Sequence, residues 1–382
     1  MTPVGEGESD AGSDAAQRAE LAAAGLYDPA APNAADRLAL LEHLLELGAR
    51  IPDLVGALDE GLSSFGGDLV RGRGRPRLTP AEVARASDVP VDVVLAVSRA
   101  AGLPRYETDE PVYRDDDIET FQIFAAAAEV FGLAASLEFT RAMGAALAGI
   151  ADAAMATFGI NLASELGEAS ELEQALAVET ASTLLVTQVP KALNTLFFHH
   201  VEAAVRREVA SGGTMKNPRV AQLSVGFLDL VGSTSAFVEL EPEDLTEAIG
   251  QFERQAIDIV VAHGGRVVKM IGDEVMFVAP DIVGACLASL ELREQVTGNS
   301  ILSELRGGLA VGGLVRGYGD FFGADVNVAA RLVKLAQPGV LLVTDAVRER
   351  VGDVDSVRFV PAGERRMRGF AEPIPVFELE RA

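Results

Sequence analysis

The sequence contains one cysteine and no tryptophan in 382 residues. A single cysteine cannot form a disulfide within the chain, so packing must hold the fold together, and nothing points to an oxidising compartment. Cys286 lies in the apolar stretch VGACLASL, which has a helical pattern. We therefore expect a buried structural thiol at this position rather than a reactive one.

The chain also lacks the sequence features of export and of membrane insertion. Its N-terminal residues are acidic and do not have the basic-then-apolar order of a signal peptide. No charge-free apolar run reaches the roughly 18–20 residues that a membrane span needs. The closest candidate, Ala142 to Ser164, is rich in alanine and glycine and carries Asp152 near its middle. These absences predict a cytoplasmic protein without a membrane span.

Basic residues are scarce: the chain has 32 Lys and Arg against 57 Asp and Glu, a formal net charge of −25. A general nucleic-acid surface needs clustered basic side chains to displace counterions, so we expect no nucleic-acid partner. Residues 1–210 have 33 acidic and 15 basic side chains, whereas residues 211–382 have 24 and 17. The second half is therefore better suited to hold a polyanion.

Composition divides the chain into four segments. Residues 1–33 are small, acidic and interrupted by proline and glycine, which predicts disorder. Residues 34–210 predict a helical domain, and the stretch SGGTMKNP at 211–218 predicts a linker. Residues 219–382 alternate between strand and helix patterns and predict a second domain.

Within the helical domain, residues 78–120 have the outline of a helix-turn-helix. Thr79 can cap a helix, Pro80 suits its first turn, and the stretch SDVP separates two short helices. From Ile118 to Val209 the pattern is helical and apolar on several faces. Helices of this kind must be buried against each other or against another subunit.

The second domain begins with a predicted order of strand, helix, hairpin, helix and strand, and three short strands end the chain. The hairpin lies in RVVKMIGDEVMFVA and turns at Gly272-Asp273. This order predicts an α+β fold with helices on one side of a mainly antiparallel sheet.

Two carboxylates occur where apolar residues dominate. Asp229 interrupts the strand pattern FLDL, and Asp273 lies in the turn of the hairpin. An ionised carboxylate in a dry strand is costly unless a group pairs with it or binds it. If the two strands are neighbours, both side chains point toward one position, where they repel each other unless cations bind. Hard oxygen ligands suit Mg²⁺ or Mn²⁺, and the alternative is that Asp229 only caps the next helix.

Three motifs, FLDLVGST, GGRVVKMIGDEVM and DFFGADVNVAARL, occur in the order and spacing of class III nucleotidyl cyclases, which the chain resembles over about residues 219–380. The resemblance implies a ferredoxin-like catalytic domain that converts ATP to 3′,5′-cyclic AMP and pyrophosphate. By position, it implies that Asp229 and Asp273 bind two divalent ions, Mg²⁺ or Mn²⁺, in each active site. One ion would lower the pKa of the ribose 3′-hydroxyl, and the other would hold the triphosphate.

The same resemblance assigns the other site residues. Lys269 and Asp320 take the places of the pair that selects adenine, in which lysine donates to N1 of the base and the carboxylate accepts from the exocyclic amine. Asn327 and Arg331 take the places of the residues that stabilise the transition state, and their spacing puts them on one helical face. Arg368 takes the place of a phosphate-contacting lysine, with an ordinary solvated cation as the alternative.

In cyclases of this class, the metal-binding aspartates and the remaining site residues meet across a dimer interface. This chain has both sets of residues and one cyclase domain. The resemblance therefore implies a homodimer with two equivalent composite sites.

The helical half also resembles, more loosely, the N-terminal domains that restrain some cyclases, a few of them sensitive to acid pH. His199 and His200 lie in the last helix before the linker, where histidines that titrate between pH 5 and 8 would shift helix packing. The alternative is an exposed pair without a role. A cavity among such apolar helices could also bind a lipid-like regulatory ligand.

A second function stays open at this point, that of a nucleotide-sensing, DNA-binding regulator. In that hypothesis residues 78–107 bind DNA, helped by the basic stretch RGRGRPR at Arg71–Arg77, and the cyclase fold only senses nucleotide. The acidity of the first half and the complete set of catalytic residues favour the enzyme.

Overall fold

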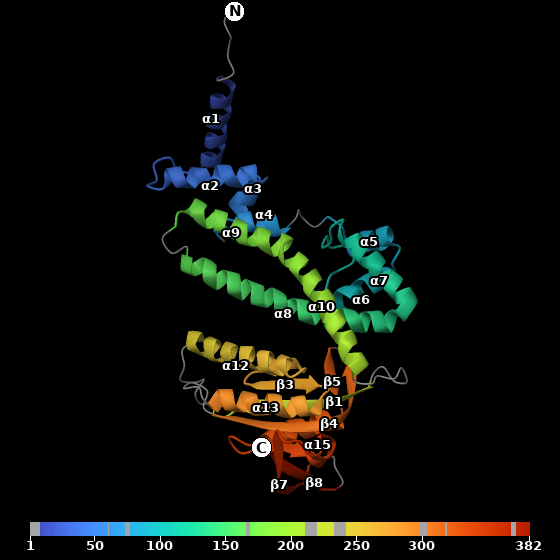
Figure 1. Cartoon of the computed structure of the whole chain (residues 1–382). Coiled ribbons are helices and arrows are strands. Elements are labelled where there is room, and N and C mark those ends of the chain that lie inside the picture. Colours follow the sequence, from blue (N-terminus) through green and yellow to red (C-terminus); the bar gives the residue numbers. More distant parts are fainter. Residues whose placement is uncertain are drawn as a thin grey trace, which may run out of the picture. The chain divides into compact units, whose positions relative to one another are not determined.

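The structure, a computed structural model, describes residues 8–59, 61–72, 77–165, 169–210, 220–232, 242–297, 304–317, 319–367 and 372–382. The chain forms two compact units, Met1–His199 and His200–Ala382 (Figure 1). The boundary between them falls inside one helix, α10 (Val189–Ala210). The predicted linker, residues 211–218, lies outside the described residues, and the predicted domain division stays a prediction.

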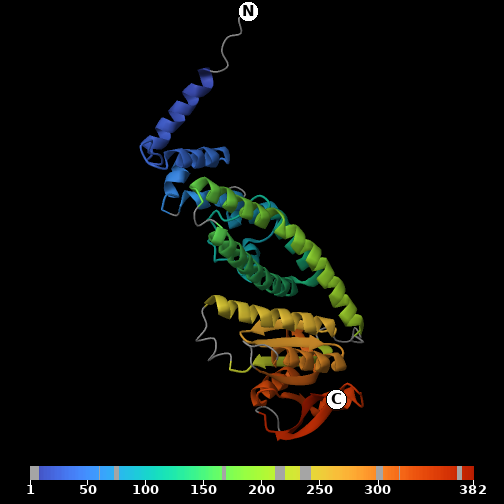
Figure 2. The same ribbon diagram turned by 60° about the vertical axis from the view of Figure 1, so that its left-hand side comes forward.

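Helices make up the first unit, and two separate apolar cores hold them. In Figure 2 this unit is the blue-to-green part of the ribbon, in which the elements are helices. One core joins α1–α4 to α9, and the other joins α5–α7 to α8. The helices before α10 are α1 (Glu8–Ala23), α2 (Ala34–Glu46), α3 (Ile51–Gly56), α4 (Leu62–Gly72), α5 (Pro80–Ser87), α6 (Val91–Ala100), α7 (Asp117–Phe131), α8 (Leu133–Glu165) and α9 (Glu171–Thr187).

The N-terminal segment corrects one prediction. Disorder over residues 1–33 is wrong from residue 8 onward, because α1 forms there. Alanine and glutamate favour a helix, and Leu21 and Leu26 are buried in the core shared with α2. Acidic composition concealed these two apolar anchors.

The helix-turn-helix outline is present as α5 and α6. The Thr79 hydroxyl accepts a hydrogen bond from the Glu82 backbone N–H at 3.2 Å, and the Glu82 carboxylate accepts one from the Thr79 N–H at 2.8 Å. This capping box starts α5, as the sequence predicts for Thr79. Both helices bury apolar residues in the core that they share with α7, and this burial gives them a packing role.

The long helices α8 and α10 expose large apolar side chains in the single chain. Phe139 is 61% exposed, and Phe197 and Phe198 are 55% and 60% exposed. The sequence predicts that these helices are buried either against each other or against another subunit. Within one chain they are not buried against each other. By length and composition alone, Leu133–Gly159 of α8 could cross a membrane. The requirement for a charge-free run had excluded this stretch.

The second unit is built on a sheet with the strand order β2-β3-β1-β4-β6-β8-β7, and β5 pairs with β4 at the side. Among the described pairs, β4 and β6 are parallel and the others are antiparallel. The strands are β1 (Val220–Leu230), β2 (Arg266–Ile271), β3 (Glu274–Ala279), β4 (Leu305–Gly317), β5 (Asp320–Phe322), β6 (Leu341–Thr344), β7 (Val357–Arg365) and β8 (Ile374–Arg381). The helices are α12 (Pro242–Ala262), α13 (Ile282–Thr297), α14 (Ala324–Leu335) and α15 (Asp345–Val351).

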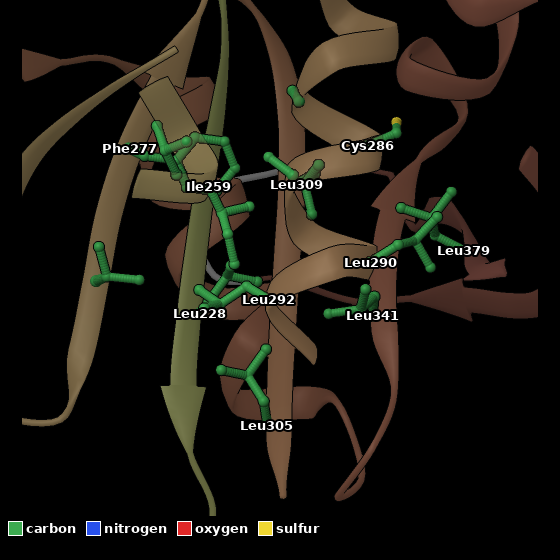
Figure 3. Packing of buried hydrophobic residues seen from close by; sticks show 14 of the residues in the cluster. Leu228, Ile259, Phe277, Cys286, Leu290, Leu292, Leu305, Leu309, Leu341 and Leu379 are labelled. Carbon is green, nitrogen blue, oxygen red and sulfur yellow. The ribbon is translucent and has the colours of Figure 1, made fainter. Parts of the chain in front are cut away.

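Both faces of this sheet carry helices, which corrects the prediction of helices on one side. Successive strand residues point to opposite faces, so Leu228 packs under α12, α13 and α15, and Phe227 packs under α14. Figure 3 shows the first of these cores, with Leu228, Phe277 and Leu309 of the sheet against residues of α12 and α13. The α14 motif is polar at its N-terminal end, and its buried apolar stripe is too narrow to predict a helix covering a face of its own.

Cys286 lies on α13 inside the same core and is fully buried. Burial raises the pKa of its thiol to about 12. The structural role predicted for this cysteine is confirmed.

Candidate active site

The two aspartates singled out in the sequence lie at the same end of two paired strands. β1 and β3 are antiparallel neighbours, with Asp229 opposite Glu274, and the Leu230 N–H donates to the Asp273 carbonyl at 3.2 Å. The predicted neighbourhood of these strands is confirmed. Phe227 belongs to the core under α14, so by alternation the Asp229 side chain projects from that same face of the sheet.

An arginine neutralises the charge of Asp229 at its nearly buried position. The Asp229 side chain is almost buried, and its Oδ2 accepts hydrogen bonds from Arg306 Nε at 2.8 Å and Nη2 at 2.5 Å. Arg306 lies directly opposite Asp229 on β4. Sequence reasoning missed this residue. The available signal was a lone arginine at the start of the apolar, glycine-rich strand LRGGLAVGG.

A third carboxylate, Glu274, adds negative charge to this corner. Burial raises the pKa of Glu274, and the charges of Asp229 and Asp273 raise it further, while Lys334 and Arg306 lower it. Burial is the larger cause, and the added effect of Asp229 and Asp273 means that negative charges lie near one another here, an environment that favours a cation. In the part of the chain that the structure describes, no three His, Cys, Asp or Glu side chains form a metal cage. Two carboxylates completed by water and phosphate oxygens are the usual ligands of Mg²⁺.

Lys269 and Asp320, the predicted base-selecting pair, meet in the structure. The Lys269 ammonium and an Asp320 carboxylate oxygen form an ion pair between β2 and β5. The other Asp320 oxygen accepts a hydrogen bond from the Phe321 N–H at 2.8 Å, which fixes the carboxylate. The side chains keep 41% and 23% of their surface exposed, so a ligand can reach both the donor and the acceptor.

Asn327 and Arg331 lie one turn apart on α14, as their spacing predicts. The helix packs closely on the sheet because two positions of β4 are glycine. A Cβ atom at Gly308 would stand 2.6 Å from Leu332 Cβ, and one at Gly312 would overlap the Asp325 carboxylate. Burial raises the pKa of that carboxyl group.

Several predicted residues cannot be placed in the site. Arg368 lies outside the described residues, as do Ser233 and Thr234 of the first motif. His199 and His200 are exposed on α10 and lie on either side of the unit boundary. Most of the basic stretch Arg71–Arg77 is also outside the described side chains.

Comparison with known proteins follows the two units. Residues 17–205 match the adenylate cyclase regulatory domain, and residues 215–380 match the adenylate and guanylate cyclase catalytic domain. The chain is 31% identical to a pH-sensitive adenylate cyclase of Mycobacterium tuberculosis over 360 residues, 91% of this chain and 88% of the relative. It is 40% identical to an adenylate cyclase of Streptomyces coelicolor over 143 residues, 37% of each chain. The crystal structure of the adenylyl cyclase CyaB from P. aeruginosa aligns with 43% of this chain and 95% of its own, at 23% identity and a TM-score of 0.39.

Proposed function

Because the chain belongs to the class III adenylate cyclases along both its helical and its catalytic part, we propose that it converts ATP to 3′,5′-cyclic AMP and pyrophosphate at the site built on β1, β3, β5 and α14. The contact between Lys269 and Asp320 carries this proposal. It holds a donor beside an acceptor at an accessible position, which is the pattern that N1 and the exocyclic amine of adenine require.

Divalent ions fit the carboxylate corner of this site. Asp229 and Asp273 would hold Mg²⁺ or Mn²⁺, two ions in each site, a use of divalent metals that is general in the family. The crowding of negative charge around Glu274 supports this assignment. When bound, such ions lower the pKa of the ribose 3′-hydroxyl and neutralise phosphate charge.

The side chains of the chain itself then orient and stabilise the nucleotide. Lys269 and Asp320 fix the base, which sets the direction of the ribose and the phosphates. Arg331 and Asn327 stabilise the negative charge that grows on the α-phosphate as the 3′-oxygen attacks it. Arg368 keeps its predicted role as a phosphate contact.

The active form would be a homodimer with two composite sites, since class III cyclase domains work as dimers. The exposed apolar side chains of α8 and α10 support association of two chains, because such a surface is rarely left in water. In each site one chain would supply the metal-binding aspartates, and its partner would supply the base-selecting and transition-state residues.

The helical unit would regulate this dimer. A relative that matches 91% of this chain is named pH-sensitive, which supports a proton as the signal. His199 and His200 would receive it, because histidine gains a proton in the physiological range. An apolar cavity of about 600 Å³ between α6, α7 and α8, lined by Phe124, Phe131 and Phe139 among others, supports the hypothesis of a lipid-like ligand. A cytoplasmic location remains part of the proposal.

A double substitution of the base-selecting pair tests the assignment. Lys269→Glu with Asp320→Cys should lower cyclic AMP formation from ATP roughly a hundredfold or more, because a buried polar edge of the base loses both partners. A matched control removes another exposed ion pair of the same unit, by Arg358→Glu with Glu380→Cys on β7 and β8. Surface pairs of this kind contribute about 0–1 kcal/mol, so the control should keep its turnover. Unchanged ATP turnover in the first variant would show that the pair does not read the base.

A further inference from the structure

A further cavity lies in the second unit, apart from the carboxylate corner. Its volume is about 430 Å³. Three arginines from three elements line it, Arg207 of α10, Arg266 of β2 and Arg316 of β4. His200 of α10 lines it as well, and the other walls are mostly apolar, formed by Leu223, Val278 and Phe321 among others.

Two of the three arginines of this cavity, Arg207 and Arg266, are short of counter-charge. Among the described side chains, neither Arg207 nor Arg266 forms an ion pair with a carboxylate. The Arg266 guanidinium instead lies over the Phe321 ring, 5.6 Å from its centroid. The adjacent Arg206 differs, because it pairs with Glu202 one turn earlier on the helix.

Burial and neighbouring positive charges both disfavour the charged forms of Arg207 and Arg266. Burial lowers the pKa of Arg207, and the charge of Arg316 lowers it further. Burial also lowers the pKa of Arg266, as do Arg207 and Arg316, while Asp320 raises it. Guanidinium groups nevertheless stay charged in proteins. Arg207 and Arg266 therefore repel each other across the cavity, and an anion bound between them would relieve that repulsion.

From this cavity we propose a regulatory anion site that takes the phosphate group of a small molecule. Guanidinium groups bind phosphate oxygens through paired hydrogen bonds, a geometry that lysine does not offer. The cavity is larger than a bare phosphate ion, and its apolar walls beside Phe321 suit a phosphomonoester with an apolar or aromatic body. Bound there, the phosphate ties the last turns of α10 to β2 and β4.

This cavity adjoins the proposed ATP site at Phe321, the residue after Asp320, but shares no assigned residue with it. It uses none of the residues assigned to metal, base or transition state, and it lies around the start of β2 rather than around its end. The inference also does not rest on the cyclase reaction, since it concerns binding in the absence of ATP. The two proposals can therefore fail independently. A chain that forms cyclic AMP but binds no phosphate would contradict only the anion site, and a chain that binds phosphate but forms no cyclic AMP would contradict only the proposed function.

Calorimetric titration of the full chain in chloride buffer tests the proposal. The probes are inorganic phosphate and phenyl phosphate, without ATP or divalent metal. Arg207→Gln should weaken binding of both probes roughly tenfold or more, because hydrogen bonds between charged groups are lost. Arg206→Gln is the matched control and should bind like the unchanged chain. Arg207→Lys should bind more weakly than the unchanged chain and more tightly than Arg207→Gln, because lysine keeps the positive charge but cannot form the paired hydrogen bonds of a guanidinium group.

The two probes separate the sources of the phosphate. Tighter binding of phenyl phosphate would identify a phosphomonoester as the ligand, and equal binding would identify free phosphate. Equal affinities in Arg207→Gln and Arg206→Gln would overturn the proposal, because the anion would then bind elsewhere. Failure of the unchanged chain to bind either probe up to about 10 mM would overturn it as well. Circular dichroism melting in chloride checks that the variants are folded.

Discussion

The two units of the chain cover their apolar side chains in different ways. In the second unit, helices lie on both faces of the sheet, and Phe252 and Phe277 are fully buried. In the first unit, Phe139 of α8 is mostly exposed. Phe198 is mostly exposed as well, and it lies on α10, the helix that runs from the first unit into the second. The sheet unit thus has a complete core in one chain, whereas the long helices need another surface to cover them. We therefore expect that loss of a catalytic side chain leaves subunit association intact, whereas loss of association also removes the proposed composite sites.

The largest effect should come from removing one carboxylate of the catalytic corner. Asp229→Ala or Asp273→Ala should abolish cyclic AMP formation, a loss of at least about a hundredfold, while light scattering still finds the dimer. Mixing Asp229→Ala chains with Arg331→Ala chains should restore part of the activity, since one of the two composite sites is then whole. No recovery on mixing would mean that the sites are not shared between chains.

A pair of phenylalanine substitutions compares the two ways of covering apolar surface. Phe277→Ala should reduce the free energy of unfolding by about 3–5 kcal/mol in a urea titration, because it leaves a cavity in a closed core. Phe198→Ala should instead weaken dimerisation, because its ring is exposed in the single chain. If Phe198→Ala leaves the dimer dissociation constant unchanged, this face of α10 is not an interface between chains.

A smaller effect, a few-fold change, is expected from pH. The whole chain should become more active as pH falls from about 8 to 6, the range in which histidine gains a proton. Residues 211–382 alone should lack that rise, because they lack His199 and His200. The measurement is a pair of pH profiles of cyclic AMP formation. A full acid response in the double variant His199→Ala, His200→Ala would exclude these histidines as the sensor.

The smallest effect concerns the thiol in the closed core. Because burial raises the pKa of Cys286 to about 12, the folded chain favours the neutral thiol. The corresponding stability is present below the ordinary thiol pKa of about 8.5 and is lost as pH rises through about 12. At pH 8, alkylation of Cys286 should be slow in the native chain and fast in urea. Rapid native alkylation would show that the core opens readily.

The sequence predicted the features that depend on local patterns. The hairpin at Gly272 and the helix cap at Thr79 follow from turn and capping chemistry, and both are confirmed. The pairing of β1 with β3, which the hypothesis of a shared cation site takes as a condition, is present as well. The face covered by α14 and the partner of Asp229 were missed. Both depend on which residues stand opposite one another across the sheet, such as Arg306 and Asp229, and strand spacing alone does not give that register.

The close seating of α14 has a mechanical consequence. Gly308 and Gly312 let the helix approach the sheet so closely that a Cβ atom at either position would meet Leu332 or Asp325, and close packing of this kind resists sliding. Asn327 and Arg331 are therefore carried as fixed points of a rigid body. In the proposed composite site, a signal that changes the distance from these side chains to a nucleotide bound by the partner chain would have to move α14 together with the sheet. We therefore expect control to work by a rigid-body movement of one catalytic domain against the other, in which α14 moves together with its own sheet.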